Sequence, residues 1–350
     1  MDNPRATRIG LVLGAGGVLG GAWMAGALHA IADRTRFYPR HAEYIVGTSA
    51  GSVLAALGAA GVPPWLLIPE SSANIYHGLI DADGNLELAG DLWARIVRRT
   101  HLGLPSLRPG SVSLVRSAFG QPGWTGVMRV LTGLLPAGFI STDPIKETIR
   151  WVAPRGGWVQ HPNCWIVACD YASGERVVFG RDAEADIGQA VAASCAIPGF
   201  YCPEQIGERF YIDGGLHSMS NADLLFGLDL DLVVCLNPLS ARHGFAGWDP
   251  VNRVAEVTRR AVARQLDAEV ATLREEGTPV LVLEPTPDDL AAIGANVMDE
   301  RRRAKVLEVA IRTTTAQLEM PGLAPLVASL QRKEPSRPRR RLQPRLRPAV

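Results

Sequence analysis

The sequence is almost without lysine: only Lys146, Lys305 and Lys333 stand among its 36 basic residues. The arginines that carry the rest of the positive charge are interspersed with acidic residues over most of the chain, and the net charge is +1. A nucleic-acid-binding protein needs a basic patch or stripe. The body of the chain has none, so we expect no nucleic-acid partner.

Cysteine and histidine are also scarce, and they are not arranged as metal ligands. None of the seven histidines forms an H-x-x-x-H pair or stands near paired cysteines, which are the spacings typical of zinc sites. The five cysteines are an odd number and fall mostly in apolar segments. We therefore expect no metal, and buried thiols in a reducing, cytoplasmic compartment. Cys195 and Cys202 are near enough in sequence to pair, but nothing requires a disulfide.

Only one segment, Ile9 to Leu28, lacks charge for long enough to cross a membrane. Arg5 and Arg8 precede it and Ala25-Gly26-Ala27 imitates a cleavage site, so a signal peptide is an alternative. Seven of its twenty residues are glycine, however, which disfavours a membrane helix. We interpret the segment as a core strand, a loop and a helix, and we expect no membrane-spanning helix.

A candidate nucleophile, Ser49, lies at the centre of Gly47-Thr48-Ser49-Ala50-Gly51, which has the G-x-S-x-G pattern of a nucleophile elbow. Apolar residues precede this motif and small, helix-compatible residues follow it, so Ser49 is expected on a strand-to-helix turn. Such a turn is too tight for Cβ atoms at Gly47 and Gly51. The positive end of the following helix would stabilise charge beside the serine oxygen. The pentapeptide also occurs by chance, as a plain turn of small residues.

A strand, a glycine loop and a helix stand near the start of the chain. The apolar segment Ile9–Leu13 runs into Gly14-Ala15-Gly16-Gly17-Val18-Leu19-Gly20, and an apolar helix is expected from about 21 to 32. Unpaired N–H groups at such a helix start form an anion cradle. A dinucleotide-binding loop is the rival interpretation, but the glycine spacing is one residue too long and the next strand lacks the acidic residue that binds ribose. We therefore expect no nucleotide cofactor.

The third motif contains Asp213, in Tyr211-Ile212-Asp213-Gly214-Gly215. Just upstream stands Ala193-Ser194-Cys195-Ala196-Ile197-Pro198-Gly199-Phe200-Tyr201-Cys202-Pro203. Taken alone, Asp-Gly is a common turn dipeptide. Together the glycine loop, the G-T-S-A-G elbow, the A-S-x-A-x-P-x-x-x-x-P segment and D-G-G follow the order seen in patatin-like phospholipases. The chain resembles that family over roughly residues 8 to 240, and four ordered motifs are far more specific than one.

The resemblance implies a role for each motif. Ser49 would be the nucleophile, Asp213 its only partner, and the backbone N–H groups of Gly16 and Gly17 the oxyanion hole. The other motif glycines are Gly14, Gly20, Gly47, Gly51, Gly214 and Gly215. The substrates that the resemblance implies are acyl esters, commonly phospholipids and other lipids.

Two positions depart from the family pattern. The slot before the last glycine of the loop usually holds Arg or Lys, and here it is Leu19. The backbone donors survive this change, but recognition of a phosphate headgroup loses a cation. After D-G-G the chain continues from Leu216 to Asn221 without the proline that often follows in relatives.

Serine–aspartate chemistry can also be argued without the family. A serine hydroxyl is a poor nucleophile until a base removes its proton. An aspartate with an ordinary pKa of about 3.9 is a weak base, so burial should raise the pKa of Asp213 toward the working pH. Asp213 would act a second time by activating the water that releases the acyl group.

Two other interpretations remain open. Ser49, Asp213 and His243 stand in the chain order of an α/β-hydrolase triad, although an ordinary surface-loop histidine is the simpler explanation of His243. We favour the Ser49–Asp213 dyad because the glycine loop follows the first strand, close before the elbow. The second interpretation is a catalytically weak relative that binds lipid or a protein partner, and Leu19 is its best argument.

Strands that alternate with helices predict an α/β fold, with a mostly parallel central sheet and helices on both faces. The resemblance implies that this fold has a patatin-like Ser–Asp hydrolase architecture. We expect a catalytic domain over 1–325 and a disordered, Arg- and Pro-rich tail over 326–350. From Arg332 to Arg347 the tail carries seven Arg, one Lys and one Glu, a net charge of +7. This charge would serve solubility or peripheral contact with an anionic membrane.

Residues 61–140 resemble an insertion that would form either a lid or acyl-binding wall, or a small core of its own. Its apolar residues include Trp65, Leu66, Leu67, Ile68, Trp93, Trp124, Leu134 and Leu135. Beyond it we expect a helix that starts at Thr142-Asp143-Pro144 and a hairpin of 164–171 with 176–179. A helix at 186–195, strands at 232–236 and 280–283, and helices at about 251–275 and 298–318 complete the prediction.

Overall fold

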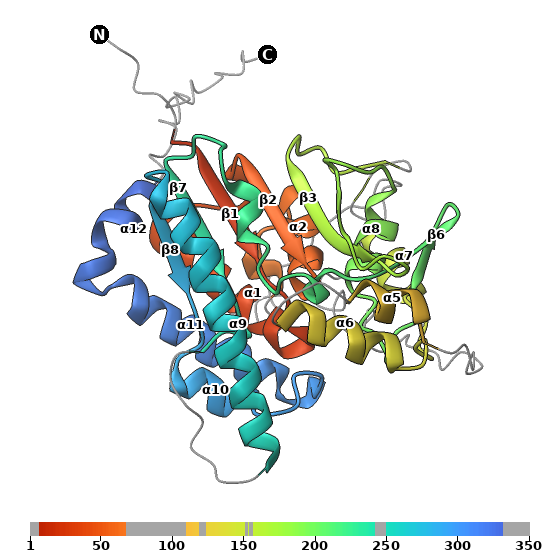
Figure 1. Ribbon diagram of the computed structural model, residues 1–350. Coiled ribbons are helices and arrows are strands. Elements are labelled where there is room, and N and C mark those ends of the chain that lie inside the picture. The colour runs from red at the N-terminus through yellow and green to blue at the C-terminus, as the bar shows by residue number, and fades with distance from the viewer. Residues whose placement is uncertain are drawn as a thin grey trace, which may run out of the picture.

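An eight-stranded sheet crosses the molecule, with helices on both of its faces (Figure 1). The computed structural model describes residues 7–67, 110–118, 124–150, 153, 157–241 and 250–331. The strands are β1 (Ile9–Leu13), β2 (Tyr44–Thr48), β3 (Cys164–Asp170), β4 (Arg176–Phe179), β5 (Glu204–Ile206), β6 (Arg209–Asp213), β7 (Leu232–Leu236) and β8 (Val280–Leu283). Their order is β5-β6-β3-β2-β1-β7-β8, and β4 pairs with β3.

Neighbouring strands in the series β3-β2-β1-β7-β8 are parallel. The pairs of β3 with β4, of β3 with β6 and of β5 with β6 are antiparallel. Every residue of β1 and β7 is buried, which is the pattern of parallel strands that are covered on both faces. The predicted mostly parallel α/β fold is therefore confirmed.

Ten α-helices and several short 3-10 helices are described. The α-helices are α1 (Gly17–Thr35), α2 (Ala50–Ala59), α5 (Val112–Ser117), α6 (Trp124–Leu134), α7 (Asp143–Arg150), α8 (Ile187–Ser194), α9 (Pro250–Glu275), α10 (Pro287–Ile293), α11 (Arg303–Leu318) and α12 (Ala324–Leu330). The 3-10 helices are η1 (Pro39–His41), η2 (Pro64–Leu67), η4 (Gly214–Leu216), η5 (Ala222–Leu225), η6 (Glu300–Arg302) and η7 (Pro321–Leu323).

Alternate residues of the strands face two separate hydrophobic cores. Leu11 and Ile45 belong to the core that packs with α1, α2, α8 and α11. Val12 and Val46 belong to the second core, which packs with Leu266 and other residues of α9. Figure 1 shows α9 crossing in front of the sheet. The period of two along each strand thus divides its apolar side chains between the two layers of helices.

The first helix begins earlier than the sequence predicts, at Gly17 instead of residue 21. A Cβ on Gly20 would lie 2.9 Å from the Pro238 ring. Gly20 therefore allows a close approach between α1 and Pro238, and it does not mark the end of the loop. Residues 9–28 form β1, the glycine loop and part of α1, as predicted. None of the helices in the described ranges is both long and apolar enough to cross a bilayer.

The expected boundary between domain and tail at 325 falls inside helix α12, which continues to Leu330. Val327 and Leu330 are buried in the main core, because a helix that starts at 324 carries both apolar side chains onto it. Residues 326–330 therefore belong to the folded part of the chain, which corrects the prediction. The Arg-rich segment from 332 onward lies outside the described residues.

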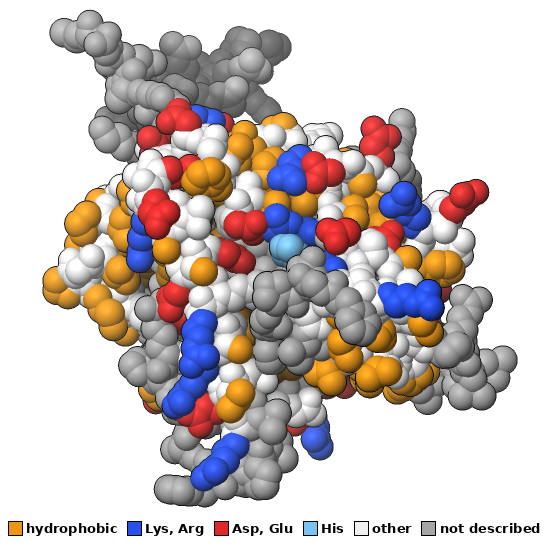
Figure 2. Space-filling model, in the orientation of Figure 1, with side chains coloured by type: hydrophobic (Ala, Val, Ile, Leu, Met, Phe, Trp, Pro, Cys, Tyr) orange, Lys and Arg blue, Asp and Glu red, His pale blue; other side chains and the backbone are white. Residues whose placement is uncertain are grey.

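Much of the 61–140 segment, including Ile68 and Trp93, also lies outside the described residues. Leu66 and Leu67 are buried, so they contribute to packing of the described fold. Leu134 and Leu135, at the end of α6, are 69% and 44% exposed. Basic and acidic side chains are intermixed over the face shown in Figure 2, as their interspersed positions in the sequence predict.

Candidate active site

Ser49 is the single residue between strand β2 and helix α2. Its backbone dihedrals are φ 54° and ψ −124°, which cost a residue with a side chain on the order of 1–3 kcal/mol. The side chain is almost completely buried. The predicted strand-to-helix turn is present, and its strain is placed at one residue.

Glycine is required on both sides of this turn. A Cβ on Gly47 would lie 2.6 Å from the Ala55 Cβ. A Cβ on Gly51 would collide with the carbonyl oxygen of Leu13. The G-x-S-x-G spacing therefore reflects close approach of the elbow to helix α2 and to strand β1.

Two buried serine hydroxyls hold the backbone of Ser49. The Ser194 hydroxyl accepts a hydrogen bond from the Ser49 N–H at 2.8 Å and donates to the Val167 carbonyl at 2.6 Å. The Ser52 hydroxyl donates to the Ser49 carbonyl at 2.6 Å. Ser194 belongs to the A-S-x-A-x-P segment, for which the sequence had suggested no role. Only its position in that motif could have drawn attention to it.

The sheet brings Asp213 to the end of β2. Strand β4 pairs with residues 166–169 of β3. The first two of these residues also pair with β2, and the last two also pair with β6. Because a strand has only two edges, β2 and β6 both lie on the edge of β3 that is opposite β4. Thr48 pairs with Val167, and Asp213 pairs with the next residue, Ala168. Strands β2 and β6 therefore meet end to end, which puts Ser49 beside Asp213.

The Asp213 carboxylate accepts a hydrogen bond from the Gly215 N–H, at 2.8 Å, and the Ser49 hydroxyl lies beside it. Burial raises the pKa of Asp213 to about 6, although the interactions with Ser49 and Gly215 favour the charged form. A carboxylate with this pKa can take a proton from the serine near neutral pH, as the chemistry of a dyad requires.

The glycine loop is fixed on both sides of Gly16 and Gly17. The Ala15 N–H donates to the Met219 carbonyl at 2.7 Å, and the Leu19 N–H donates to the Val297 carbonyl at 2.9 Å. Gly17 has a φ of 60°, which favours glycine. Over the ranges that the structure describes, no protein group accepts a hydrogen bond from the Gly16 or Gly17 N–H. These two donors stand at the start of α1, where they can hold a negative oxygen.

Leu19, which replaces the usual cation of the loop, is fully buried in the main core. It lines neither of the two cavities beside Ser49. The side chain at this position thus serves packing and contributes nothing to the lining of the site.

Two cavities meet at Ser49. The larger cavity, about 330 Å³, is lined by Ser49, Asp213, Gly16 and Gly17 together with Ala15, Thr132, Ile197, Pro198, Phe200, Gly215, Leu216, Met219, Leu239, Val297 and Met298. The smaller cavity, about 160 Å³, is lined by Gly17, Val18, Ser49, Ala50, Val53, Ile140, Ile145, Cys195, Ile197, Phe200, Tyr201, Met298 and Glu300. The structure therefore brings the four residues predicted for catalysis and oxyanion binding to one cavity.

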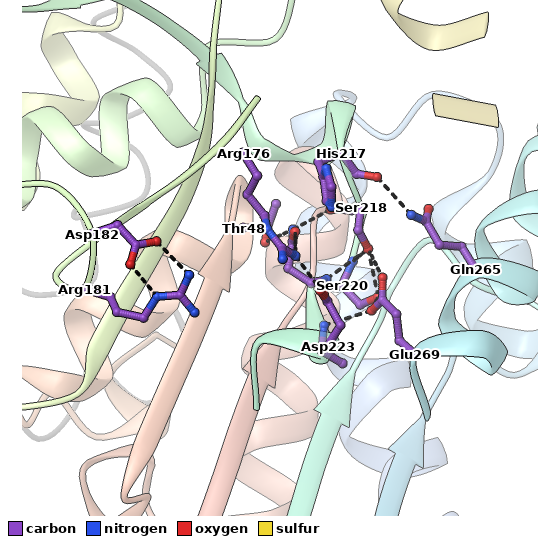
Figure 3. Close-up of polar contacts among 12 residues, drawn as sticks. Thr48, Arg176, Arg181, Asp182, His217, Ser218, Ser220, Asp223, Gln265 and Glu269 are labelled. Atoms are coloured by element: carbon purple, nitrogen blue, oxygen red, sulfur yellow. Dashed lines mark hydrogen bonds and ion pairs between the residues drawn. The ribbon is translucent and has the colours of Figure 1, made fainter. Parts of the chain in front are cut away.

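A buried carboxylate on α9 organises the loop that follows Asp213 (Figure 3). Glu269 accepts hydrogen bonds from the Ser218 hydroxyl at 2.5 Å, the Ser220 hydroxyl at 2.7 Å and the Ala222 N–H at 2.8 Å. Burial raises the pKa of Glu269, and the two hydroxyls oppose that shift. The sequence does not identify Glu269, because a glutamate in a long helix is normally exposed.

The same loop, residues 218–222, also contacts the elbow and the glycine loop. The Asn221 side-chain amide donates to the Thr48 hydroxyl at 3.1 Å, and Thr48 immediately precedes Ser49. The Met219 carbonyl accepts the hydrogen bond from Ala15. Glu269 is therefore connected through one loop to two segments that line the site, the elbow and the glycine loop.

The sequence also singles out His243, Cys195 and Cys202. His243, the third member of the alternative triad, lies outside the described residues. Cys195 and Cys202 are both free thiols, and burial raises the pKa of Cys195 above its usual range. Among the residues that the structure describes, no cluster of three His, Cys, Asp or Glu side chains could hold a metal ion.

Comparison with known proteins identifies a protein family and similar solved structures. The family model for patatin-like phospholipases matches residues 11–226, which is more than half of the chain. The crystal structure of VipD from Legionella pneumophila is similar with a TM-score of 0.36 and 14% sequence identity. That similarity covers 90% of this chain and 67% of VipD.

Proposed function

Because the chain belongs to the patatin-like phospholipase family, we propose that it is a serine hydrolase that cleaves acyl esters of lipids through a Ser49–Asp213 dyad. The enzyme would be of the phospholipase A, lysophospholipase or lipid esterase type. The convergence of Ser49, Asp213, Gly16 and Gly17 on one cavity is the observation that carries this proposal.

Acylation begins when Asp213 accepts the Ser49 proton while the serine oxygen bonds to the ester carbonyl carbon. The carbonyl oxygen becomes an oxyanion, held by the Gly16 and Gly17 N–H groups. One such donor typically contributes on the order of 3 kcal/mol of transition-state stabilisation. The bond to the alcohol oxygen then breaks, and that oxygen takes the proton from Asp213.

Deacylation reverses these roles. Asp213 accepts a proton from water while the water oxygen bonds to the acyl carbon. The bond to Ser49 breaks, the serine oxygen recovers the proton from Asp213, and a carboxylic acid is released. No metal or organic cofactor takes part in either half of the reaction.

The dyad is a better explanation of the site than the triad with His243. In a serine–histidine–aspartate triad the imidazole lies between the serine and the carboxylate. Here Ser49 and Asp213 line the same cavity, and the Ser49 hydroxyl lowers the pKa of the carboxylate, so the two side chains are placed for direct proton transfer. The raised pKa of Asp213 supports the same assignment, since an ordinary carboxylate would be too weak a base.

The substrate class follows from the family and from the two cavities, whose linings are mainly apolar. We propose a lipid or other acyl ester as substrate. The basic segment from Arg332 would add peripheral contact with an anionic membrane surface. We further propose a cytoplasmic protein whose catalytic domain extends to residue 330.

Replacement of Ser49 by Ala tests the proposal. The Ser49→Ala variant is expected to lose ester hydrolysis and labelling by a fluorophosphonate, because both reactions need the activated hydroxyl. Circular dichroism should be unchanged, since Ala fits the turn sterically. The exposed Ser329, replaced by Ala, is the matched control and should keep wild-type activity.

The outcomes separate the alternatives. Turnover above background in folded Ser49→Ala protein would contradict the assignment of the nucleophile. A wild-type protein that reacts neither with esters nor with fluorophosphonate would instead be a binding protein that has kept the family fold. Loss of activity in His243→Ala by several orders of magnitude would favour the triad.

A further inference from the structure

Two cavities of different size meet at Ser49, and we propose that the smaller one binds the acyl group and the larger one binds an uncharged, apolar alcohol group. This proposal rests on the proposed function, because it assigns the two halves of an ester to the two sides of the nucleophile. The new element is the assignment of particular lining residues to selection of the acyl group and of the alcohol group.

The position of Asp213 decides the assignment. When the tetrahedral intermediate breaks down, the alcohol oxygen must take its proton from Asp213, so that oxygen has to come within hydrogen-bonding reach of the carboxylate. Asp213 lines the larger cavity and does not line the smaller one. The alcohol therefore leaves on the side of the larger cavity.

The acyl group remains bonded to Ser49 while the alcohol departs, so the acyl group must occupy the smaller cavity. Helix α2 contributes Val53 and helix α7 contributes Ile145 to the smaller cavity, and both side chains are almost fully buried. Rigid helical walls of this kind limit the volume that an acyl chain can fill. Glu300, the charged lining residue, is exposed and so belongs to the rim.

The larger cavity has about twice the volume of the smaller one. Leu216, Met219 and Leu239 provide apolar walls. Its charged lining residue, within the described ranges, is the Asp213 carboxylate. An anionic headgroup placed there would lose its hydration and would be repelled by ionised Asp213. A neutral alcohol, such as an alkanol or a glycerol ester, avoids both costs.

Two series of esters test this division. In the first series a p-nitrophenyl leaving group is kept and the acyl chain is lengthened from acetyl. In the second series butyrate is kept and the alcohol is lengthened from methanol. Each methylene that fits should raise kcat/KM about four-fold, which corresponds to about 0.8 kcal/mol. We expect the rise to end at a shorter length in the acyl series than in the alcohol series.

Variants that fill one cavity separate the two sides. Ile145→Phe, in the smaller cavity, should lower kcat/KM at least ten-fold for the longer acyl chains relative to the shortest, and should leave the dependence of kcat/KM on alcohol length unchanged. Leu239→Phe, in the larger cavity, should lower kcat/KM for the longer alcohols relative to methanol and leave the dependence on acyl length unchanged. Ile145→Val and Leu239→Val remove volume instead of adding it, so they serve if a Phe variant fails to fold, and each should extend the preferred length of its own series.

A comparison of headgroups completes the experiment. A monoacylglycerol should be cleaved at least ten-fold more efficiently than the lysophosphatidic acid with the same acyl chain. The division is wrong if Ile145→Phe changes the alcohol series instead, or if each variant changes both series equally. A preference for lysophosphatidic acid would overturn the assignment of an uncharged alcohol. Failure of the proposed function is different, since no ester in either series would then be hydrolysed in a Ser49-dependent way.

Discussion

The Asp213 carboxylate combines two properties that usually oppose each other, since it is buried and yet has to become charged. Burial raises its pKa to about 6 from a usual value of 3.8. The hydrogen bond from Gly215 and the interaction with the Ser49 hydroxyl limit that rise. At the scale of the residue, the site therefore holds a carboxylate whose proton affinity is close to what a general base needs.

The activity should depend on pH through this single group. If Asp213 must be ionised to accept the serine proton, kcat/KM for a p-nitrophenyl ester should rise with pH around 6 and level off above 7. The measurement is a pH profile of kcat/KM in wild-type protein, with circular dichroism to confirm folding across the range. A profile that continues to rise ten-fold per unit through pH 8 would indicate a different base.

The stability of the folded protein should fall as pH rises, whereas the activity should increase. A pKa that is higher in the folded than in the unfolded state favours folding at low pH, and that contribution is lost as pH rises from about 4 through about 6. A shift from 3.8 to about 6 corresponds to a cost on the order of 3 kcal/mol at pH 8. Asp213→Asn should therefore lose nearly all activity and yet unfold at a higher temperature than wild type at pH 8.

This gain should disappear at pH 4, where Asp213 is protonated in the folded protein. Thermal unfolding of wild type and of Asp213→Asn at both pH values checks the sign. The prediction fails if the Asn variant is less stable than wild type at pH 8, because its carboxamide then packs or bonds worse than the charged group.

At the scale of secondary-structure elements, the site depends on a loop and a helix that do not themselves carry the chemistry. Residues 218–222 contact the glycine loop through Met219, the elbow through Asn221 and helix α9 through Glu269. The three donors that converge on Glu269 are buried, so they need an acceptor there. We infer that Glu269 positions the loop and, through it, the reacting segments.

Glu269→Gln should lower kcat by about ten-fold while KM for a short p-nitrophenyl ester stays within two-fold. The carboxamide offers one acceptor oxygen and adds two N–H donors, so it cannot accept all three hydrogen bonds as the carboxylate does. The rate of fluorophosphonate labelling of Ser49 should fall in parallel with kcat. That rate distinguishes a misplaced nucleophile from a general loss of folded protein.

Glu275→Gln is the matched control, because Glu275 is an exposed residue at the end of the same helix. It should leave both kcat and the labelling rate unchanged. Equal losses in the two variants, or an unchanged labelling rate in Glu269→Gln, would contradict a positioning role for Glu269.

At the scale of the whole molecule, charge is divided unequally along the chain. Residues 332–350 carry a net charge of +7 and residues 1–331 a net charge of −6. A net negative body is repelled by an anionic membrane, and a basic segment is attracted to it within a Debye length. Any electrostatic attachment to such a surface should therefore depend on the C-terminal segment.

Truncation after Gln331 should remove most of the binding to vesicles that contain phosphatidylserine. Binding to pure phosphatidylcholine vesicles should be weak for both proteins, and kcat/KM for a short p-nitrophenyl ester should not change. Co-sedimentation with vesicles, at low and at physiological salt, measures the bound fraction of each protein. Undiminished binding of the truncated protein to anionic vesicles would show that another surface makes the contact.

The features that the sequence by itself determined are local ones. The elbow around Ser49, strand β1, the hairpin of β3 with β4 and the buried strands β7 and β8 each depend on the spacing of neighbouring residues. Close backbone approach requires glycine, and strands buried on both faces require continuous apolar runs. Such requirements are visible in a short stretch of chain, so these elements could be predicted with nearly correct bounds.

Only the tertiary structure decided how distant residues meet. Asp213 reaches Ser49 because β2 and β6 share one edge of β3, a pairing that no local pattern specifies. The hydroxyl of Ser194 under the elbow, the burial of Leu19 and the buried carboxylate of Glu269 depend in the same way on contacts between remote segments. Burial sets the pKa of Asp213 and the shape of the two cavities, and burial is a property of the assembled fold.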